Sequence, residues 1–109
     1  MAFTEGQSAG TTNNTTAVTV VSTPSSGYRV VKCMNFYNKD TANATLTVEY
    51  YDGSTAYEIC KITLSAGDVL ILDEVYVVPS GGTAVIRCKS SGTVTTNQLP
   101  FVATYGDST

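Results

Sequence analysis

With 109 residues and a mass of 11.5 kDa, the chain has the size of one domain, and its 42% hydrophobic residues against 14% charged ones argue against a disordered protein. A net charge of −3 argues against nucleic-acid binding, which depends on clustered Lys and Arg, and no apolar run approaches the roughly 18 residues that span a membrane. The absence of His removes most hydrolytic triads and His-ligated metal sites, and the absence of Trp removes the side chain that stacks best on sugars.

Residues 1–15 are predicted to form an extended N-terminal arm. They read MAFTEGQSAGTTNNT, in which small and polar residues dominate and Phe3 is the one side chain of a type that is normally buried. Such a segment is either flexible or ordered only against a neighbouring molecule, and an apolar anchor ahead of a polar spacer favours the second case. The chain is therefore predicted to consist of an arm, 1–15, and a β-sandwich domain, 16–109.

From residue 16 onward, the pattern is that of short β-strands separated by turns. Runs of Val and Thr favour a pleated sheet, whereas Pro, Gly, Asn and Asp mark the breaks. The predicted strands are 16–23, 28–37, 44–51, 56–64, 69–73, 75–78, 83–89, 93–96 and 99–105. Residues 69–78 are interpreted as one strand bent around Asp73 and Glu74. Asp52-Gly53 predicts a tight hairpin, and Pro100 favours an edge position for the last strand.

Strands at this spacing, with no helical period in any window, predict an all-β fold. We expect an antiparallel β-sandwich of about seven to eight strands. The immunoglobulin pattern of Cys, Trp and Cys is missing, so a jelly-roll-like arrangement fits better. In the long strand 28–37, the even positions Val30, Met34 and Phe36 are expected to share the core face with Lys32.

Cys33, Cys60 and Cys88 each lie inside a predicted strand. An odd number of cysteines cannot close completely into disulfides within the chain, and no fourth ligand is available for a zinc site. A nucleophilic Cys needs a base, and His is absent. We expect reduced thiols at or near the core of a protein made in a reducing cytoplasm, with neither a metal nor a cofactor.

The carboxylates are expected to have structural roles. Asp40, Asp52 and Asp68 each lie in a predicted turn, where Asp caps the local backbone. Asp73 and Glu74 are adjacent, so in a strand they point to opposite faces and do not form a catalytic pair. A calcium site built from Asp40 or Asp73 with loop carbonyls is the alternative, although no DxDxDG motif is present.

Three tyrosines flank the predicted Asp52-Gly53 hairpin. Tyr50 and Tyr51 point to opposite faces, so one of them is expected to be exposed. An exposed Tyr can anchor a protein contact or stack on a sugar, whereas cross-strand packing with Tyr57 is the simpler interpretation. The candidate partner-binding residues are therefore Phe3, Tyr51 and Tyr57.

The outer faces of the predicted sheets carry few charges. Arg87 and Lys89 share one face, but Lys32 and Lys61 lie in other strands, so the cations form no phosphate-binding stripe. The predicted strand edges carry little of the Lys and Pro that normally prevents strand pairing. Such surfaces suit protein–protein contacts in an assembly, and a soluble monomer with mild surfaces is the alternative.

A series of strand and turn landmarks runs from Thr16 to Leu72. They comprise a Val/Thr strand, a Pro…Gly turn, Phe36-Tyr37-Asn38, Asp40-Thr41, the Asp52-Gly53 hairpin and the turn Leu64-Ser65-Ala66-Gly67-Asp68. This run, about half of the chain, resembles a module of small virion proteins of tailed bacteriophages, similar to capsid decoration (cement) proteins. Residues 75–109 depart from it. The resemblance implies a non-catalytic protein that binds the outer capsid lattice and stabilises it, often as a homotrimer.

The sequence thus predicts a non-enzymatic structural protein of a phage virion, made in the host cytoplasm. Its expected partners are further copies of itself and the major capsid protein or another virion protein, and neither nucleic acid nor a membrane. The alternative is a carbohydrate- or receptor-binding β-sandwich module of a tail fibre or adhesin, which requires exposed Tyr50 or Tyr51 beside Asp or Asn in a groove. An enzyme is disfavoured because no nucleophile, base and orienting group can be assembled without His.

Overall fold

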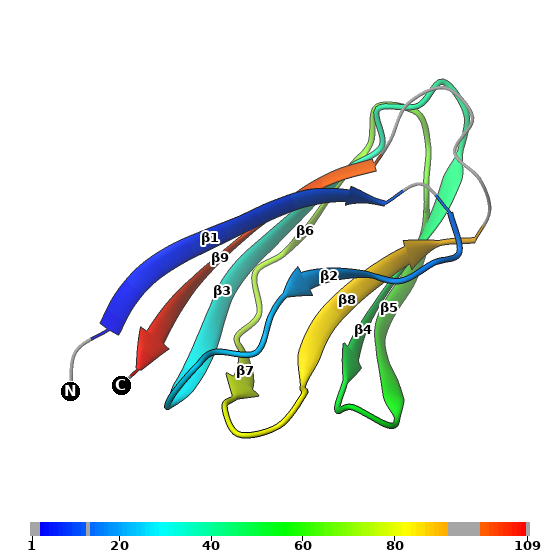
Figure 1. The fold of residues 1–109 in the computed structure, drawn as a ribbon. Helices are drawn as coiled ribbons and strands as arrows, with labels where there is room; N and C mark the ends of the chain where they lie inside the picture. The colour runs from blue at the N-terminus through cyan, green and yellow to red at the C-terminus, as the bar shows by residue number, and fades with distance from the viewer. Residues whose placement is uncertain (1–2, 13, 92–98, 109) are drawn as a thin grey trace.

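The computed structural model describes residues 3–12, 14–91 and 99–108. Its fold is all-β, with two antiparallel sheets packed as a sandwich (Figure 1). The described residues form nine strands, β1 (Phe3–Thr12), β2 (Val18–Val21), β3 (Tyr28–Tyr37), β4 (Ala44–Tyr51), β5 (Ala56–Leu64), β6 (Val69–Leu72), β7 (Tyr76–Pro79), β8 (Val85–Ser90) and β9 (Leu99–Ser108). The strand predicted at 93–96 lies outside the described residues. This part of the chain contains no helix long and apolar enough to cross a membrane.

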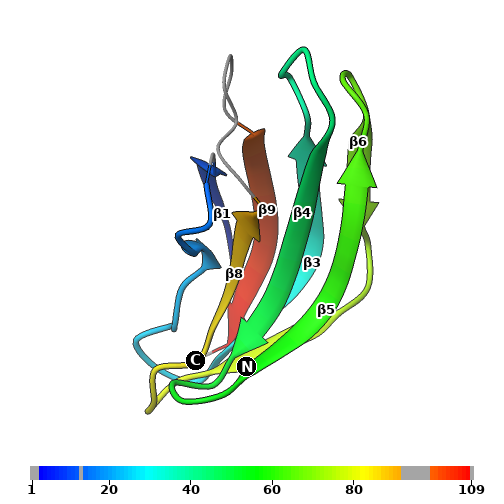
Figure 2. The ribbon, with the colours of Figure 1, turned by 90° about the vertical axis from the view of Figure 1, so that its right-hand side faces the viewer.

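The strand order is that of a jelly roll. One sheet, called sheet I here, has the order β1-β9-β3-β6, with β7 also paired to β3, and the other, sheet II, has the order β2-β8-β4-β5. Because β6 and β7 pair with successive parts of β3, they act as one edge strand interrupted at 73–75. With that strand counted once, each sheet has four strands, which confirms the predicted fold class. Figure 2 shows the β4–β5 hairpin of sheet II along one side of the sandwich.

The core lies between the two sheets and draws on both. Its fully or nearly fully buried apolar side chains include Val20, Val21, Val31, Met34, Phe36, Leu46, Val48, Val78, Ile86, Cys88, Phe101 and Ala103. The rings of Phe36 and Phe101 pack at a tilt of 45°, with their centroids 6.1 Å apart. This separation is in the range that favours aromatic pairs.

A β-bulge in β3 overturns one expectation about which residues face the core. The pairing of β3 with β9 shifts register between Val31 and Cys33, and a bulge reverses which face each later residue takes. Val31 is therefore buried before the bulge and Met34 after it, while Val30 and Lys32 face outward. The prediction that Val30 and Lys32 share a face with Met34 was wrong for this reason.

Two further expectations need correction, namely the edge position of the last strand and the two-residue turn at Asp52-Gly53. β9 lies between β1 and β3 and is not an edge strand; its pairing with β3 ends at Phe101, so the missing N–H of Pro100 costs no bond to β3. The β4–β5 connection spans residues 52–55 rather than a two-residue turn, and only Gly53 among them has a positive φ, of 105°.

Asp52 nevertheless has the turn-capping role that the sequence predicts. Its Oδ1 accepts hydrogen bonds from the backbone N–H of Ser54, at 2.9 Å, and of Thr55, at 2.7 Å. These bonds stabilise the carboxylate and lower the pKa of Asp52. Asp68 acts similarly, because its Oδ2 accepts the backbone N–H of Ser65 at 2.9 Å.

The segment predicted as an arm contains β1, which is extended and pairs with β9 of its own chain from Phe3 to Thr12. Its glycines let aromatic rings of β9 lie against it. A Cβ added at Gly6 would lie 2.7 Å from the Tyr105 ring, and one added at Gly10 would lie 2.7 Å from the Phe101 ring. A side chain at either position would have to displace one of these rings, so the packing favours glycine there.

Candidate functional site

The outer face of sheet I carries an exposed apolar patch. Four large side chains form it, namely Tyr37, Val69, Ile71 and Val102, and each is between 41% and 58% exposed. The sheet register brings them together, because Tyr37 lies opposite Val69, and Asn35 lies between Ile71 on β6 and Val102 on β9. A shallow depression of about 170 Å³ lies within this patch, lined by Asn35, Tyr37, Pro100, Phe101 and Val102.

A buried asparagine holds the end of β3 against the turn that precedes β6. The side-chain amide of Asn38 donates to the carbonyls of Ala42, at 3.0 Å, and Leu64, at 2.9 Å, and its Oδ1 accepts the backbone N–H of Asp40 at 3.0 Å. The backbone of Asn38 also bonds to Gly67 and Asp68. These bonds fix Tyr37 beside Val69. Asn38, Asp40 and the turn at 64–68, which are landmarks of the resemblance to phage virion proteins, take part in these hydrogen bonds.

The outer face of sheet II has a different character, since its side chains are mostly polar or charged. Thr45 and Thr63 share a hydrogen bond of 2.9 Å between their hydroxyls. Glu49 pairs with Arg87, whose guanidinium lies 3.9 Å above the ring of Tyr51. The polar groups named here bond to one another within the face. Unlike the side chains of the apolar patch, they already have partners in the same chain.

The structure does not bring the three predicted contact residues together. Tyr51 lies under Arg87 and its hydroxyl donates to the carbonyl of Gly53 at 3.0 Å. Tyr57 is 55% exposed but lies opposite Tyr50, on the face of the strand pair away from Tyr51. The backbone of Phe3 pairs with Ser108 at the start of β1, in the other sheet. Their role in partner binding stays a prediction.

The apolar patch itself was missed by sequence reasoning, although the sequence carries a signal for it. Residues 69–72 read VLIL, without the polar residues that alternate in a strand with one solvent-facing side. Leu70 and Leu72 pack against the core, and Val69 and Ile71 point outward. This edge strand is therefore apolar on both faces, and its outward side chains form part of the exposed patch.

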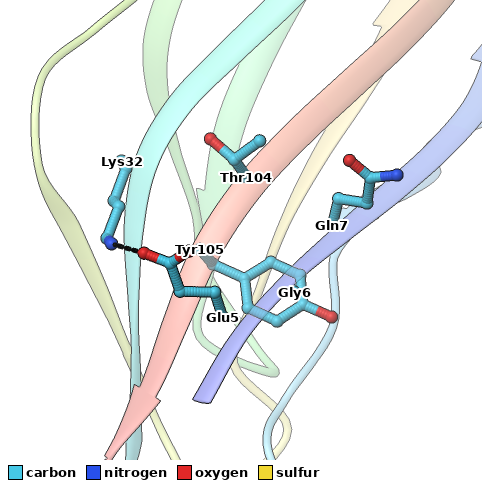
Figure 3. Close-up of a pocket in the computed structure, with 6 residues that line it drawn as sticks. All are labelled: Glu5, Gly6, Gln7, Lys32, Thr104 and Tyr105. Carbon is cyan, nitrogen blue, oxygen red and sulfur yellow. Dashed lines mark hydrogen bonds and ion pairs between the residues drawn. The ribbon is translucent and has the colours of Figure 1, made fainter. Parts of the chain in front are cut away.

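A second depression, of about 480 Å³, lies near the start of β1 and is lined by Glu5, Gly6, Gln7, Lys32, Thr104 and Tyr105 (Figure 3). Lys32 Nζ donates to Glu5 Oε1 at 2.8 Å, and both side chains are well exposed. An ion pair of this kind contributes little energy. The depression therefore offers an open polar surface whose two charges neutralise each other.

Arg29 ties together the inner side of sheet I near this depression. Its guanidinium binds Asp107 through two hydrogen bonds, of 2.7 and 2.9 Å, and lies 3.9 Å from the centroid of the Tyr105 ring. It also donates to the carbonyl of Ser22 at 3.0 Å. The bond to Arg29 lowers the pKa of Asp107 and correspondingly raises that of Arg29. This cluster serves the stability of the sandwich.

The three cysteines are free thiols. Cys88 is in the core, where burial raises its pKa to about 12, and Cys60 is half-buried with a pKa raised by the same cause. Asp40 Oδ1 accepts the backbone N–H of Thr41 at 2.7 Å, as expected of a turn residue. The described residues include no group of three or more His, Cys, Asp or Glu side chains placed to hold a metal ion.

Comparison with solved structures gives likenesses in fold. A chain from work titled "Bacillus endospore appendages form a novel family of disulfide-linked pili" superposes with a TM-score of 0.52 and 14% identity, over 96% of this chain and 85% of that chain. A chain of the cyanophage Pam1 capsid asymmetric unit superposes with a TM-score of 0.45 and 20% identity, over 96% and 83%. No family model and no curated protein matches the sequence. The first likeness supports the fold, and neither assigns an activity.

Proposed function

We propose that this protein is a non-enzymatic structural component of a phage virion, which binds the capsid surface as a decoration (cement) protein. The observation that carries the proposal is the apolar patch on the outer face of sheet I. Tyr37, Val69, Ile71 and Val102 contribute nothing to the core from these exposed positions, so they are available for another protein surface. The resemblance of residues 16–72 to phage virion proteins supports the same assignment.

The dimensions of the molecule suit attachment through a face. Its principal extents are 45 × 26 × 18 Å, so the broad face of one sheet can supply the roughly 800 Å² that each partner contributes to a standard interface. Burial of the patch gains about 25 cal/mol for each Å² of apolar surface removed from water. A modest affinity for each copy is sufficient where many copies bind one shell together.

The proposed partners are the major capsid protein or another virion protein, together with further copies of this chain. The phage resemblance implies that these copies form a homotrimer. The virion is accordingly the proposed location of the protein, after synthesis in the host cytoplasm.

The test is attachment to particles of the phage that encodes the chain. Mass spectrometry of purified virions should find the protein at a copy number comparable with that of the capsid subunits. Purified protein should also rebind to particles from which it has been stripped, and saturate them. Virions that lack the protein, or stripped particles that do not rebind it, would exclude the decoration role.

The carbohydrate- or receptor-binding alternative has less support from the geometry. It depends on an exposed Tyr ring beside Asp or Asn, yet the guanidinium of Arg87 covers one side of the Tyr51 ring. Tyr57 is exposed, but its neighbour across the strands is Tyr50 rather than a polar residue. A glycan array separates the two proposals, because a decoration protein should bind no glycan on it.

A further inference from the structure

The edges of the two sheets differ in how well they are protected against strand pairing. An unpaired edge presents a row of free N–H and C=O groups that can bind another strand, and natural proteins block such rows with short strands, bulges, Lys or Pro. Sheet I ends at β1 on one side and at β6 and β7 on the other, and sheet II ends at β2 and β5. The protection of each edge can therefore be compared.

Three of these edges carry recognisable protection. β2 has only four residues, and its pairing with β8 shifts register after Thr19. The β6–β7 edge is interrupted at 73–75 and ends at Pro79. β5 contains Glu58 and Lys61, and its pairing with β4 shifts register between Val48 and Glu49.

β1 carries none of these devices. It has ten residues, pairs with β9 over its whole length without a register shift, and contains neither Lys nor Pro. Its one charged residue is Glu5. In the described part of the chain, no strand pairs with its outer edge. Figure 1 shows β1 running along the border of the molecule.

We propose that the outer edge of β1 is an interface for β1 of a second copy of this chain. The two strands pair antiparallel about a two-fold axis perpendicular to the sheet, so sheet I continues from one copy into the next. A second copy is the occupant that fits because the edge is self-complementary, whereas the other edges of the molecule are protected against this kind of pairing.

The charge on β1 agrees with a two-fold antiparallel contact. Such an axis keeps outward-facing residues opposite outward-facing residues, and the longest overlap of the two strands places it at the level of Gln7 or of Ser8. Glu5 then lies opposite Ala9 or Thr11 of the second copy, and never opposite the second Glu5. A parallel pairing in register would instead place the two Glu5 carboxylates together, which is unfavourable.

The pairing has a consequence for attachment. A two-fold axis perpendicular to sheet I leaves the outer faces of both copies on the same side, and with them both apolar patches. Two patches that face one way can engage a shell together, so the pair would attach more tightly than either copy alone. The pairing itself rests on the edge of β1 and does not require the proposed function to be correct.

The test compares charges placed on the edge with the same charges placed one or two strands inward. The edge variant combines Gln7→Glu and Ala9→Glu, which are exposed and lie close to the axis. In either register the new carboxylates lie opposite each other or opposite Glu5 of the second copy, so they repel. The control combines Thr104→Glu and Asn35→Glu, which are exposed on the same face but lie on interior strands, with Thr104 directly opposite Gln7. Light scattering after size-exclusion chromatography gives the mass of each, and circular dichroism confirms that each is folded.

We expect the wild-type protein to have an even multiple of the chain mass of 11.5 kDa. This is a dimer, or a hexamer if a homotrimer is the smaller unit. The edge variant should halve that mass, and the control should keep it. A wild-type monomer at millimolar concentration, an odd multiple, or a mass that the edge charges leave unchanged would each overturn the pairing, without affecting whether the protein binds virions.

A measurement on the unmodified protein guards against misfolded variants. Hydrogen exchange should show that amides of β1 become more protected as protein concentration rises, while those of the β5 edge do not change. Protection of β1 that is independent of concentration over the range in which the mass changes would contradict the proposal.

Discussion

The outer faces of the two sheets differ, although both sheets contribute to one core. Sheet I exposes Tyr37, Val69, Ile71 and Val102, whereas the outer face of sheet II carries threonines and the ion pair of a half-buried Arg87 with the buried Glu49. Folding requires apolar residues between the sheets but does not require them outside. The outward-facing residues are therefore more informative about function than the core residues. Here they distinguish an apolar outer face from a polar one.

The largest expected effect comes from breaking the loop that positions the apolar patch. Asn38→Ala removes three hydrogen bonds of a fully buried side chain and leaves carbonyls unpaired, so it should lower the free energy of unfolding by about 3 kcal/mol. Asn35→Ala, on the exposed face of the preceding strand β3, is the matched control and should change the free energy of unfolding by less than about 0.5 kcal/mol. Urea denaturation measures both, and equal effects would show that the Asn38 bonds are not important.

The next effect tests the apolar patch directly. Ile71→Asp places a charge in the middle of the patch and should weaken binding to stripped virions by about 2 kcal/mol, or roughly 30-fold. Thr63→Asp makes the same change in charge on the exposed face of sheet II and should leave binding unchanged. Sedimentation of labelled protein with particles measures the affinities. If Thr63→Asp had the larger effect, attachment would have to be assigned to sheet II.

A smaller effect concerns acid stability. Arg29 holds the pKa of Asp107 below its ordinary value of 3.8. The pair therefore stabilises the fold fully above that value, and this contribution is lost as the pH falls through the lower pKa of the folded state. We expect no more than about 1 kcal/mol, because the Asp107 carboxylate is partly solvated. Asp107→Asn should flatten the dependence of Tm on pH below about 4, and an unchanged acid profile would contradict this assignment.

The smallest expected effect is that of salt on attachment. The four side chains of the apolar patch carry no charge at neutral pH, so raising NaCl from about 0.1 to 1 M should change virion binding by less than about threefold. A steep loss of binding with salt would instead implicate the charged face of sheet II, where Arg87 and Lys89 lie. This measurement needs no variant, and the salt dependence shows whether the apolar or the charged face binds the virion.

The sequence predicts much of this fold because its strands and turns obey local rules. Leu46 and Val48 lie in the core with Tyr50 packed against it, as the alternation in 44–51 predicts, although Thr47 and Glu49 on the other face are also buried. The Asp residues in turns are a local signal too, and the structure confirms it at Asp52 and Asp68. The bulge in β3 could not be predicted, because Val30 and Val31 are equally suited to either face. β1 was not predicted as part of the domain, because glycines do not favour a strand by themselves. The reason for Gly6 and Gly10 becomes visible only when the rings of Tyr105 and Phe101 lie against them.

The candidate surface was less predictable than the fold for a similar reason. The tyrosines near residue 52 drew attention as exposed aromatics, yet Tyr51 is covered by Arg87 from a strand far away in the sequence. The apolar patch joins residues of β3, β6 and β9, and only their register makes them neighbours. Contacts between distant segments are not visible in a single sequence without knowledge of how its strands pair.

The position of the first and last described residues has a mechanical consequence. Phe3 lies opposite Ser108, so β1 and β9 meet there at the open end of one ladder (Figure 1). A force that pulls these two residues apart would break the ladder bonds one after another, since each bond lies along the direction of pull. The β1–β9 pair should therefore separate at low force when the molecule is stretched between these two residues. An attachment made through them would resist little force.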